Sequence, residues 1–173
     1  MSELESGGFQ SVIDDARIED PSKVKRIVVC SGKVFYDLDA ARVGSPHVSK
    51  GSSLESSASE QSHKTLTDSN NVAVIRLEQF YPFPASRLGE IFATYANATE
   101  IVWTQEEPQN MGGWTFVEPR LRSILPANAT LRYIGRDASA SPATGSYAIH
   151  NLEQNKLVTD SLTISTGGTK AAG

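Results

Sequence analysis

Apolar residues along the chain follow two alternating patterns, short continuous runs and helical spacings. Four runs of mostly β-branched residues are bounded by turn or polar residues, which predicts fully buried strands. They cover residues 26–30, 72–77, 100–104 and 130–135. After each run, apolar residues recur three and four positions apart, which predicts that a helix follows each strand.

The expected helices are defined by their apolar faces. These faces are Val34, Leu38 and Ala41; then Leu88, Ile91, Phe92 and Tyr95; then Val117, Leu121, Ile124 and Leu125 in a helix beginning near Gly113; and a last helix from about Ser146 to Leu162. Strands that alternate with helices predict an α/β fold, because each crossover returns right-handedly to the same sheet. We expect a three-layer sandwich with a mostly parallel sheet covered on both faces.

The polar segments set the expected domain limits. Residues 1–22 are predicted to be an N-terminal lead-in, residues 23–165 the α/β domain, and residues 166–173 a flexible tail. Residues 44–71 contain nine serines and almost no large apolar side chain. This segment is expected to be a disordered insertion, because it buries too little surface to offset the entropy of ordering. His47 and His63 fall in it without the cysteines or spaced carboxylates of a metal site.

Composition narrows the function classes. The 173 residues include 16 basic and 20 acidic side chains, which give a net charge of -4. This charge does not indicate binding to nucleic acid or to an anionic membrane. No apolar run approaches the ~20 residues of a membrane helix, and the acidic N-terminus is unlike a targeting signal. The one cysteine, Cys30, lies in an apolar run and suits a reducing compartment better than a catalytic role.

Ligand sites in open α/β sheets lie beyond the carboxyl ends of the strands. The first such loop is Ser31-Gly32-Lys33, which combines a hydroxyl, a permissive glycine and a cation before a helix. Free N–H groups at a helix start favour a phosphate. The loop lacks the full phosphate-loop pattern, so a simple turn with a solvated lysine is the competing interpretation.

The loop after the predicted strand at 100–104 contains the adjacent carboxylates Glu106 and Glu107, followed by Pro108, two glycines and Trp114. On an extended segment adjacent side chains point to opposite sides, which argues against a shared proton or metal ion. A role in loop architecture or at an interface is favoured over catalysis. Trp114 is expected to supply a large apolar face at the start of the helix.

The last loop runs from Arg136 to Gly145 and is rich in small residues. Arg136 either clamps a carboxylate or phosphate, or pairs with a glutamate such as Glu106 or Glu107. His150 is expected to be a partly buried packing residue. The chain has no Ser-His-Asp order, HExxH, CxxC or GxGxxG motif, so no catalytic residue and no metal ligand is assigned.

Five motifs in register carry a resemblance to a known family. They are VVCSGKVFYDL, VAVIRLEQFYPFP, IVWTQEEPQNMGGW, VEPRL and YIGRDASASPATGSYAIH. In this order they resemble the C-terminal domain of the thiamine-diphosphate-dependent decarboxylating component of 2-oxoglutarate dehydrogenase, from about residue 9 to residue 162. The match breaks at the serine-rich segment, where the family usually has a shorter connection.

The resemblance implies a transketolase-like C-terminal domain that packs against the preceding domain and helps form a homodimer. The whole enzyme would decarboxylate 2-oxoglutarate with thiamine diphosphate and magnesium and pass the succinyl group to a lipoyl-bearing component. It would act in the mitochondrial matrix of a eukaryote or the cytoplasm of a bacterium. The cofactor motif of the family, GDG followed by Asn, is absent from this sequence.

The resemblance also implies an effector such as acetyl-CoA or AMP, with Ser31, Lys33 and Arg76 as phosphate contacts. Such enzymes are several times longer, so we expect a split subunit, an excised domain or a truncated product that is catalytically incomplete alone. Two alternatives stay open. One is a non-catalytic nucleotide- or acyl-CoA-sensing module, and the other is an inactive fragment with an exposed apolar interface.

Overall fold

The computed structural model describes residues 8–43, 71–142 and 145–164. The elements follow in the order β1 (Val12–Ile13), a 3-10 turn (Pro21–Lys23), β2 (Arg26–Cys30), α2 (Val34–Val43), β3 (Val72–Leu77), α3 (Ala85–Thr94), β4 (Glu100–Pro108), α4 (Trp114–Ser123), β5 (Thr130–Arg136) and α5 (Tyr147–Leu162). The strand order is β1-β3-β2-β4-β5, with β1 antiparallel and all other pairs parallel. The α/β fold with a mostly parallel sheet is confirmed.

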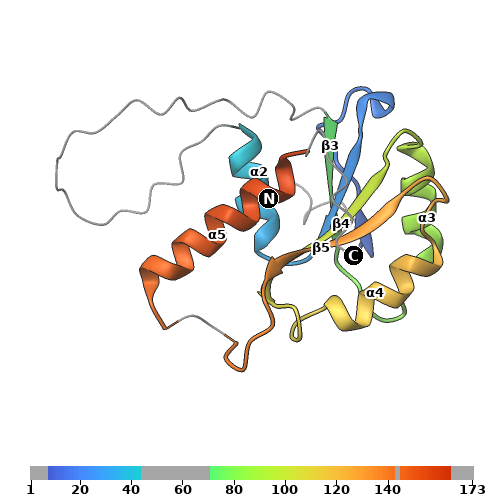
Figure 1. Ribbon diagram of the computed structural model, residues 1–173. Coiled ribbons are helices and arrows are strands. Elements are labelled where there is room, and N and C mark those ends of the chain that lie inside the picture. The colour runs from blue at the N-terminus through green and yellow to red at the C-terminus, as the bar shows by residue number, and fades with distance from the viewer. Residues whose placement is uncertain (1–7, 44–70, 143–144, 165–173) are drawn as a thin grey trace, which may run out of the picture.

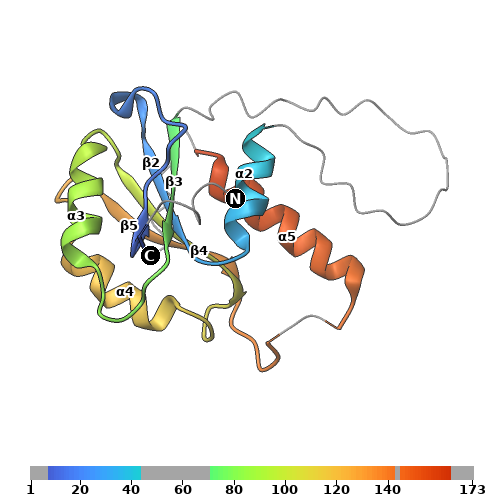
Figure 2. The same cartoon turned by 180° about the vertical axis from the view of Figure 1, so that it is seen from behind.

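The sheet is covered on both faces, as Figures 1 and 2 show. Alternate strand residues point to opposite faces, so each strand contributes to two cores. On one face Val28, Val74 and Val102 pack with α2 and α5. On the other face Ile75 and Trp103 pack with α3 and α4. The three-layer prediction is therefore confirmed. Burial of the sheet on both faces explains why the strands are continuously apolar.

The sheet begins earlier in the chain than the predicted boundary at residue 23. Val12 and Ile13 in β1 pair with β3 at its edge. The buried Asp15 carboxylate accepts a hydrogen bond from the Val74 N–H at 2.8 Å and forms an ion pair with Arg42. Part of the expected lead-in thus belongs to the domain.

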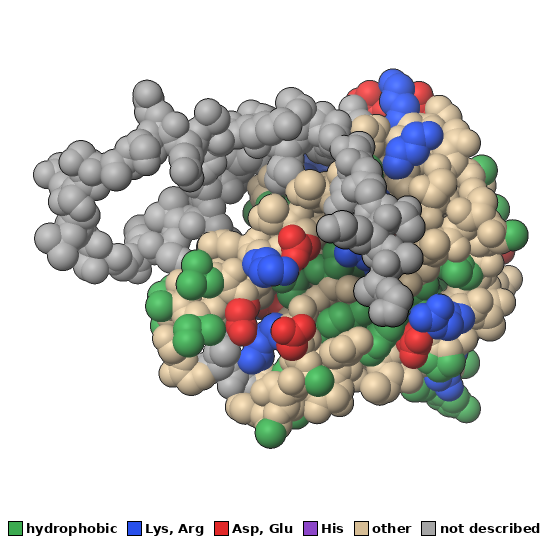
Figure 3. All heavy atoms as spheres, in the orientation of Figure 1, with side chains coloured by type: hydrophobic (Ala, Val, Ile, Leu, Met, Phe, Trp, Pro, Cys, Tyr) green, Lys and Arg blue, Asp and Glu red, His purple; other side chains and the backbone are tan. Residues whose placement is uncertain are grey.

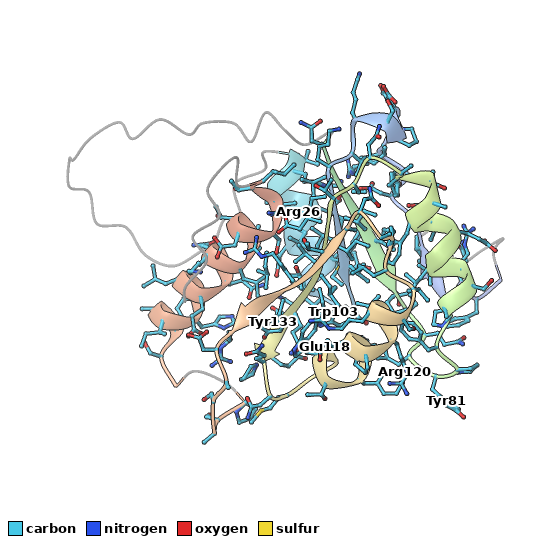
Figure 4. The ribbon with its side chains drawn as sticks, turned by 45° about the vertical axis from the view of Figure 1, so that its right-hand side comes forward. Arg26, Tyr81, Trp103, Glu118, Arg120 and Tyr133 are labelled. Atoms are coloured by element: carbon cyan, nitrogen blue, oxygen red, sulfur yellow. The ribbon has the colours of Figure 1, made fainter. Side chains whose placement is uncertain are left out.

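Helix α5 is fixed to the sheet by its C-terminal end (Figure 4). Arg26, 1% exposed, donates from Nη1 to the carbonyls of Asp160 at 2.8 Å and Thr163 at 2.6 Å, and from Nε to Glu100 Oε2 at 2.6 Å. A guanidinium at a helix C-terminus satisfies carbonyls that have no partner within the helix. Burying this charge is tolerable because all its contacts are charge-assisted or with carbonyl oxygens.

Some predicted details fall outside the described residues or differ from them. The serine-rich segment, except Asn71, and the tail at 166–173 lie outside the described residues, as do His47 and His63. Strand β4 extends to Pro108 rather than ending at residue 104, and α4 ends before Ile124. In the part of the chain that the structure describes, none of the helices has the length and hydropathy of a transmembrane segment.

Candidate functional site at the carboxyl edge of the sheet

The carboxyl ends of β2, β3, β4 and β5 bring four loops to one edge of the domain. Strand pairing places Cys30 beside both Arg76 and Thr104, so the loops that follow these strands are neighbours. The register between β4 and β5 shifts between Thr104 and Pro108. Such a bulge redirects side chains at the strand end. The observed strand topology therefore brings together the loops in which the site is predicted.

Gln105 organises the loop after β4, and sequence reasoning missed it. Its side chain is almost fully buried, and its Oε1 accepts hydrogen bonds from Trp103 Nε1 at 2.8 Å and Trp114 N at 2.9 Å. Its Nε2 lies within donor distance of the carbonyls of Glu107, Pro108 and Met111, at 3.3, 3.1 and 2.7 Å. One amide thus joins the strand end, the loop and the first residue of α4. The sequence does contain a signal that could have identified Gln105, which is a polar amide side chain within an apolar strand run.

Glu106 and Glu107 point to different neighbours. The Glu106 Oε1 lies 3.3 Å from Lys33 Nζ, on the loop after β2. The Glu107 side chain lies against Gly112, where a Cβ atom would approach Glu107 Oε2 to 3.0 Å. Gly112 also has φ of +64°, a conformation that side-chain-bearing residues rarely adopt. The turn therefore depends on glycine at this position.

Trp114 begins α4 and packs on Tyr133 of β5, with ring centroids 5.2 Å apart. The Tyr133 hydroxyl lies 3.0 Å from the carbonyl oxygens of Glu107 and Arg136, so it bridges two of the loops. Burial, more than the nearby Glu107 charge, raises the pKa of Tyr133 to about 12. The hydroxyl is therefore a neutral donor at physiological pH, which suits a structural role.

Arg136 pairs with a glutamate, but the partner is Glu153 on α5 rather than Glu106 or Glu107. Its Nε lies 2.9 Å from Glu153 Oε2, close enough for an ion pair but not aligned for a hydrogen bond. Its Nη1 donates to the Pro142 carbonyl at 3.0 Å. Arg136 thereby connects the end of β5, its own loop and helix α5.

A cavity of about 210 Å³ lies between these elements. Its charged and titratable lining comes from Glu106 and Glu107 on β4, Arg136 on β5, and His150 and Glu153 on α5. The expectation that His150 is partly buried is wrong, because the first turns of α5 extend away from the core and leave it exposed. Carboxylates outnumber the cationic side chain in this lining, so the cavity favours a positively charged group over an anion.

Ser31, Lys33 and Arg76 lie at the carboxyl ends of β2 and β3. The exposed Lys33 Nζ lies 2.9 Å from Asp37 Oδ2, and that hydrogen bond is the main reason that the pKa of Lys33 is raised. Arg76 pairs with Glu78 at 2.8 Å and lies 4.6 Å from the ring centre of Phe35. Both cations already have carboxylate partners, which an incoming phosphate would have to displace.

The described residues do not form a site that fits thiamine diphosphate with magnesium. Among residues 8–43, 71–142 and 145–164, no group of three or more His, Cys, Asp or Glu side chains is arranged to hold a metal ion. The cations at the carboxyl edge are engaged by Asp37, Glu78 and Glu153. No chemical step through that cofactor is therefore assigned to this domain.

Cys30 is expected to be unreactive in the folded protein. It is fully buried, and desolvation raises the pKa of its thiol to about 12. This shift leaves very little thiolate at pH 8, and the thiolate is the reactive form. Iodoacetamide should leave Cys30 unmodified in buffer and modify it fully in urea, as mass spectrometry would show. Equal rates in both conditions would contradict the buried placement.

Several large apolar side chains stay exposed. Tyr81, on the loop after β3, is 84% exposed and points away from the domain in Figure 4. On the first turns of α5, Tyr147 and Leu152 are each 69% exposed and Ile149 is 50% exposed. Grouped apolar surface of this kind is typical of contacts with another protein or domain.

Comparisons with known proteins identify the relatives of this chain. A family model described as 2-oxoglutarate dehydrogenase C-terminal matches residues 1–49 and 58–162. The 2-oxoglutarate dehydrogenase E1 component of Cupriavidus necator is 43% identical over 158 residues, which are 91% of this chain and 14% of the relative. Oxoglutarate dehydrogenase of Buchnera aphidicola is 37% identical over 165 residues, which are 95% of this chain and 16% of the relative.

A third relative carries a different name. The probable 2-oxoadipate dehydrogenase complex component E1 homolog of Dictyostelium discoideum is 40% identical over 153 residues, which are 88% of this chain and 15% of the relative. The chain thus spans between 14% and 16% of the length of these three relatives. The family model covers most of the chain, and the resemblance seen in the five motifs is confirmed. The chain belongs to the 2-oxoglutarate dehydrogenase C-terminal family.

Proposed function

We propose that this chain serves as the C-terminal domain of the E1 component of 2-oxoglutarate dehydrogenase and acts only beside the other domains of that enzyme. The observation that carries the proposal is the match of nearly the whole chain to a small part of E1 relatives. The intact enzyme would decarboxylate 2-oxoglutarate with thiamine diphosphate and magnesium. It would then transfer the succinyl group to the lipoyl-bearing succinyltransferase component.

The role of this domain would be architectural. The loops at the carboxyl edge are held by Gln105, Tyr133 and Arg136, whose polar groups contact backbone or α5. Such contacts give the loops a fixed shape that a neighbouring domain can pack against. Glu106 and Glu107 would define that surface, and the buried Trp114 would support it from the start of α4. The other domains and the homodimer mate would hold the cofactor and the substrate.

Those other domains would determine which 2-oxo acid the enzyme accepts as its substrate. Relatives named for 2-oxoglutarate and for 2-oxoadipate are 43% and 40% identical to this chain, so its sequence does not separate the two names. The compartment would follow the source, the cytoplasm in a bacterium or the mitochondrial matrix in a eukaryote.

A complementation experiment tests the proposal. The E1 component of C. necator lacking the segment that matches this chain would be mixed with the purified chain. Decarboxylation of 2-oxoglutarate would be followed with ferricyanide as electron acceptor. We expect the truncated enzyme to be inactive alone and to gain activity as the chain is added. If the two proteins form no complex by sedimentation velocity, the proposal is wrong.

Effector binding at Ser31, Lys33 and Arg76 is a second proposed role. It is supported by the strand register, which places Arg76 beside the residue that precedes Ser31. Calorimetry with acetyl-CoA and AMP should then show weak binding, because the anion must compete with Asp37 and Glu78. Lys33→Ala should abolish the heat signal, and Lys25→Ala, which changes a lysine at the opposite end of β2, should not. Identical isotherms for all three proteins would contradict this role.

A further inference from the structure

Two ion pairs lie next to each other at the carboxyl edge of the sheet. Lys33 Nζ, on the loop after β2, lies 3.3 Å from Glu106 Oε1 on β4. Arg136 Nε, at the end of β5, lies 2.9 Å from Glu153 Oε2 on α5. Figure 3 shows acidic and basic side chains beside one another over α5 and the end of β5. Charges arranged in this way can exchange partners when one of them is neutralised.

Glu106 belongs to both parts of this arrangement. It pairs with Lys33, and it also lines the cavity of about 210 Å³ together with Arg136. Its side chain is 29% exposed, so solvent borders it on one side. A change of side-chain rotamer can move its carboxylate from Lys33 towards Arg136. Glu106 therefore connects the loop after β2 with the cavity.

Arg136 has a donor that can take a further carboxylate. Its buried Nε makes no hydrogen bond within the described part of the chain, although Glu153 Oε2 is 2.9 Å away. Its Nη1 donates to the Pro142 carbonyl at 3.0 Å. A guanidinium presents five N–H donors in a planar fork and often binds a carboxylate through two of them. Glu106 and Glu153 are therefore possible competitors for Arg136.

Helix α5 is sensitive to such competition in its first half. Among residues 147–156, all of which the structure describes, none is buried, and the buried residues of the helix lie within its last six. Its first turns extend beyond the sheet in both views of the ribbon. The Arg136–Glu153 pair and a hydrogen bond of 2.8 Å from Gln154 Nε2 to Asp37 Oδ2 tie this half to the domain. A segment with few buried contacts opens locally at low cost in free energy.

We propose that Glu106 couples the anion site at Lys33 to helix α5. An anion bound to Lys33 displaces the Glu106 carboxylate. The released Glu106 then competes with Glu153 for Arg136, and the first half of α5 opens more often. The response to an anion rests on the effector role proposed above, whereas the coupling between the two ion pairs does not.

Substitution of Lys33 tests the coupling without a ligand, because it removes the cation that holds Glu106. The measurement is hydrogen exchange of amides 150–156 in the purified chain, read by mass spectrometry. Lys33→Ala should raise these rates about two- to fivefold, the range that corresponds to loss of a modest ion pair. Lys33→Ala combined with Glu106→Gln should return them to the rates of the unmodified chain. A neutral amide competes much more weakly for Arg136 than a carboxylate does.

Two controls isolate the role of Glu106. Lys33→Ala combined with Glu107→Gln should exchange as fast as Lys33→Ala alone, because Glu107 lies against Gly112. Amides of α3 (Ala85–Thr94), on the other face of the sheet, should exchange equally in every variant. Circular dichroism should show that all the variants are folded.

Anion binding supplies the second part of the test. In calorimetry, Glu106→Gln should bind AMP about two- to fivefold more tightly than the unmodified chain, because an internal competitor has been removed. Glu107→Gln should bind AMP as the unmodified chain does. Saturating AMP should raise the exchange rates of amides 150–156 in the unmodified chain but not in Glu106→Gln.

The outcomes separate the coupling from the effector role. If Lys33→Ala leaves the exchange of amides 150–156 unchanged, or raises it equally with and without Glu106→Gln, the coupling is overturned. If AMP binds but Glu106→Gln binds it no more tightly, Glu106 is not a competitor and the proposal is also overturned. If the exchange rates depend on Glu106 as expected but neither AMP nor acetyl-CoA binds any of the proteins, the effector role alone is overturned and the coupling is supported.

Discussion

Arg26→Met should reduce the free energy of unfolding by about 3–5 kcal/mol, the range for removing one partner of a buried ion pair. The substitution fills most of the space but leaves Glu100 and the carbonyls of Asp160, Ser161 and Thr163 without the guanidinium. The last turn of α5 should then detach from the sheet. Urea denaturation followed by circular dichroism would measure the change.

Arg132→Met is the matched control, because Arg132 pairs with the same glutamate. Its Nη1 lies 2.6 Å from Glu100 Oε1, but its side chain is 51% exposed. An exposed pair contributes between zero and about 1 kcal/mol, so this variant should be nearly as stable as the unmodified chain. Equal losses for the two variants would mean that burial of Arg26 does not account for its effect.

Gln105→Leu should destabilise the domain by about 3 kcal/mol or more. It removes the acceptor of Trp103 Nε1 and Trp114 N and the donor to three loop carbonyls. Each buried polar group left without a partner costs about 1–3 kcal/mol. The same change should release the loop at 106–113, which would appear as faster hydrogen exchange there.

Gln79→Leu provides the comparison for Gln105. Its side-chain amide donates one exposed hydrogen bond to the Pro82 carbonyl at 2.7 Å. Water can replace that partner, so the loss should stay below about 1 kcal/mol. If the Gln105 and Gln79 variants unfold at the same urea concentration, Gln105 does not organise the loop.

Most of the fold could be predicted from sequence because the sheet is parallel and buried. The strands at 26–30 and 72–77 have the predicted limits, since uninterrupted β-branched runs are required by helices on both faces. Strand β1 was not predicted, because Val12 and Ile13 form no run of their own. They become a strand only through pairing with β3, and Asp15 fixes that edge through Val74. Contacts between distant segments decide such short elements.

The candidate site was predictable in position but not in detail. Topology alone places Ser31, Glu106 and Arg136 at the carboxyl edge. The network of Gln105 depends on the bulge after Thr104, and the partner of Arg136 depends on where α5 returns over the sheet. His150 was expected to pack because the helix was expected to lie on the core along its whole length. Sequence periodicity does not show where a helix extends beyond the sheet.

The central claim is that this chain is a working C-terminal domain of an E1 component. A chimera tests it most directly: residues 9–164 of this chain replace the matching segment of the C. necator E1 component in one polypeptide. We predict that the chimera folds and retains most of the 2-oxoglutarate decarboxylation rate of the parent enzyme. A chimera that is folded and dimeric but as inactive as the truncated enzyme would contradict the claim.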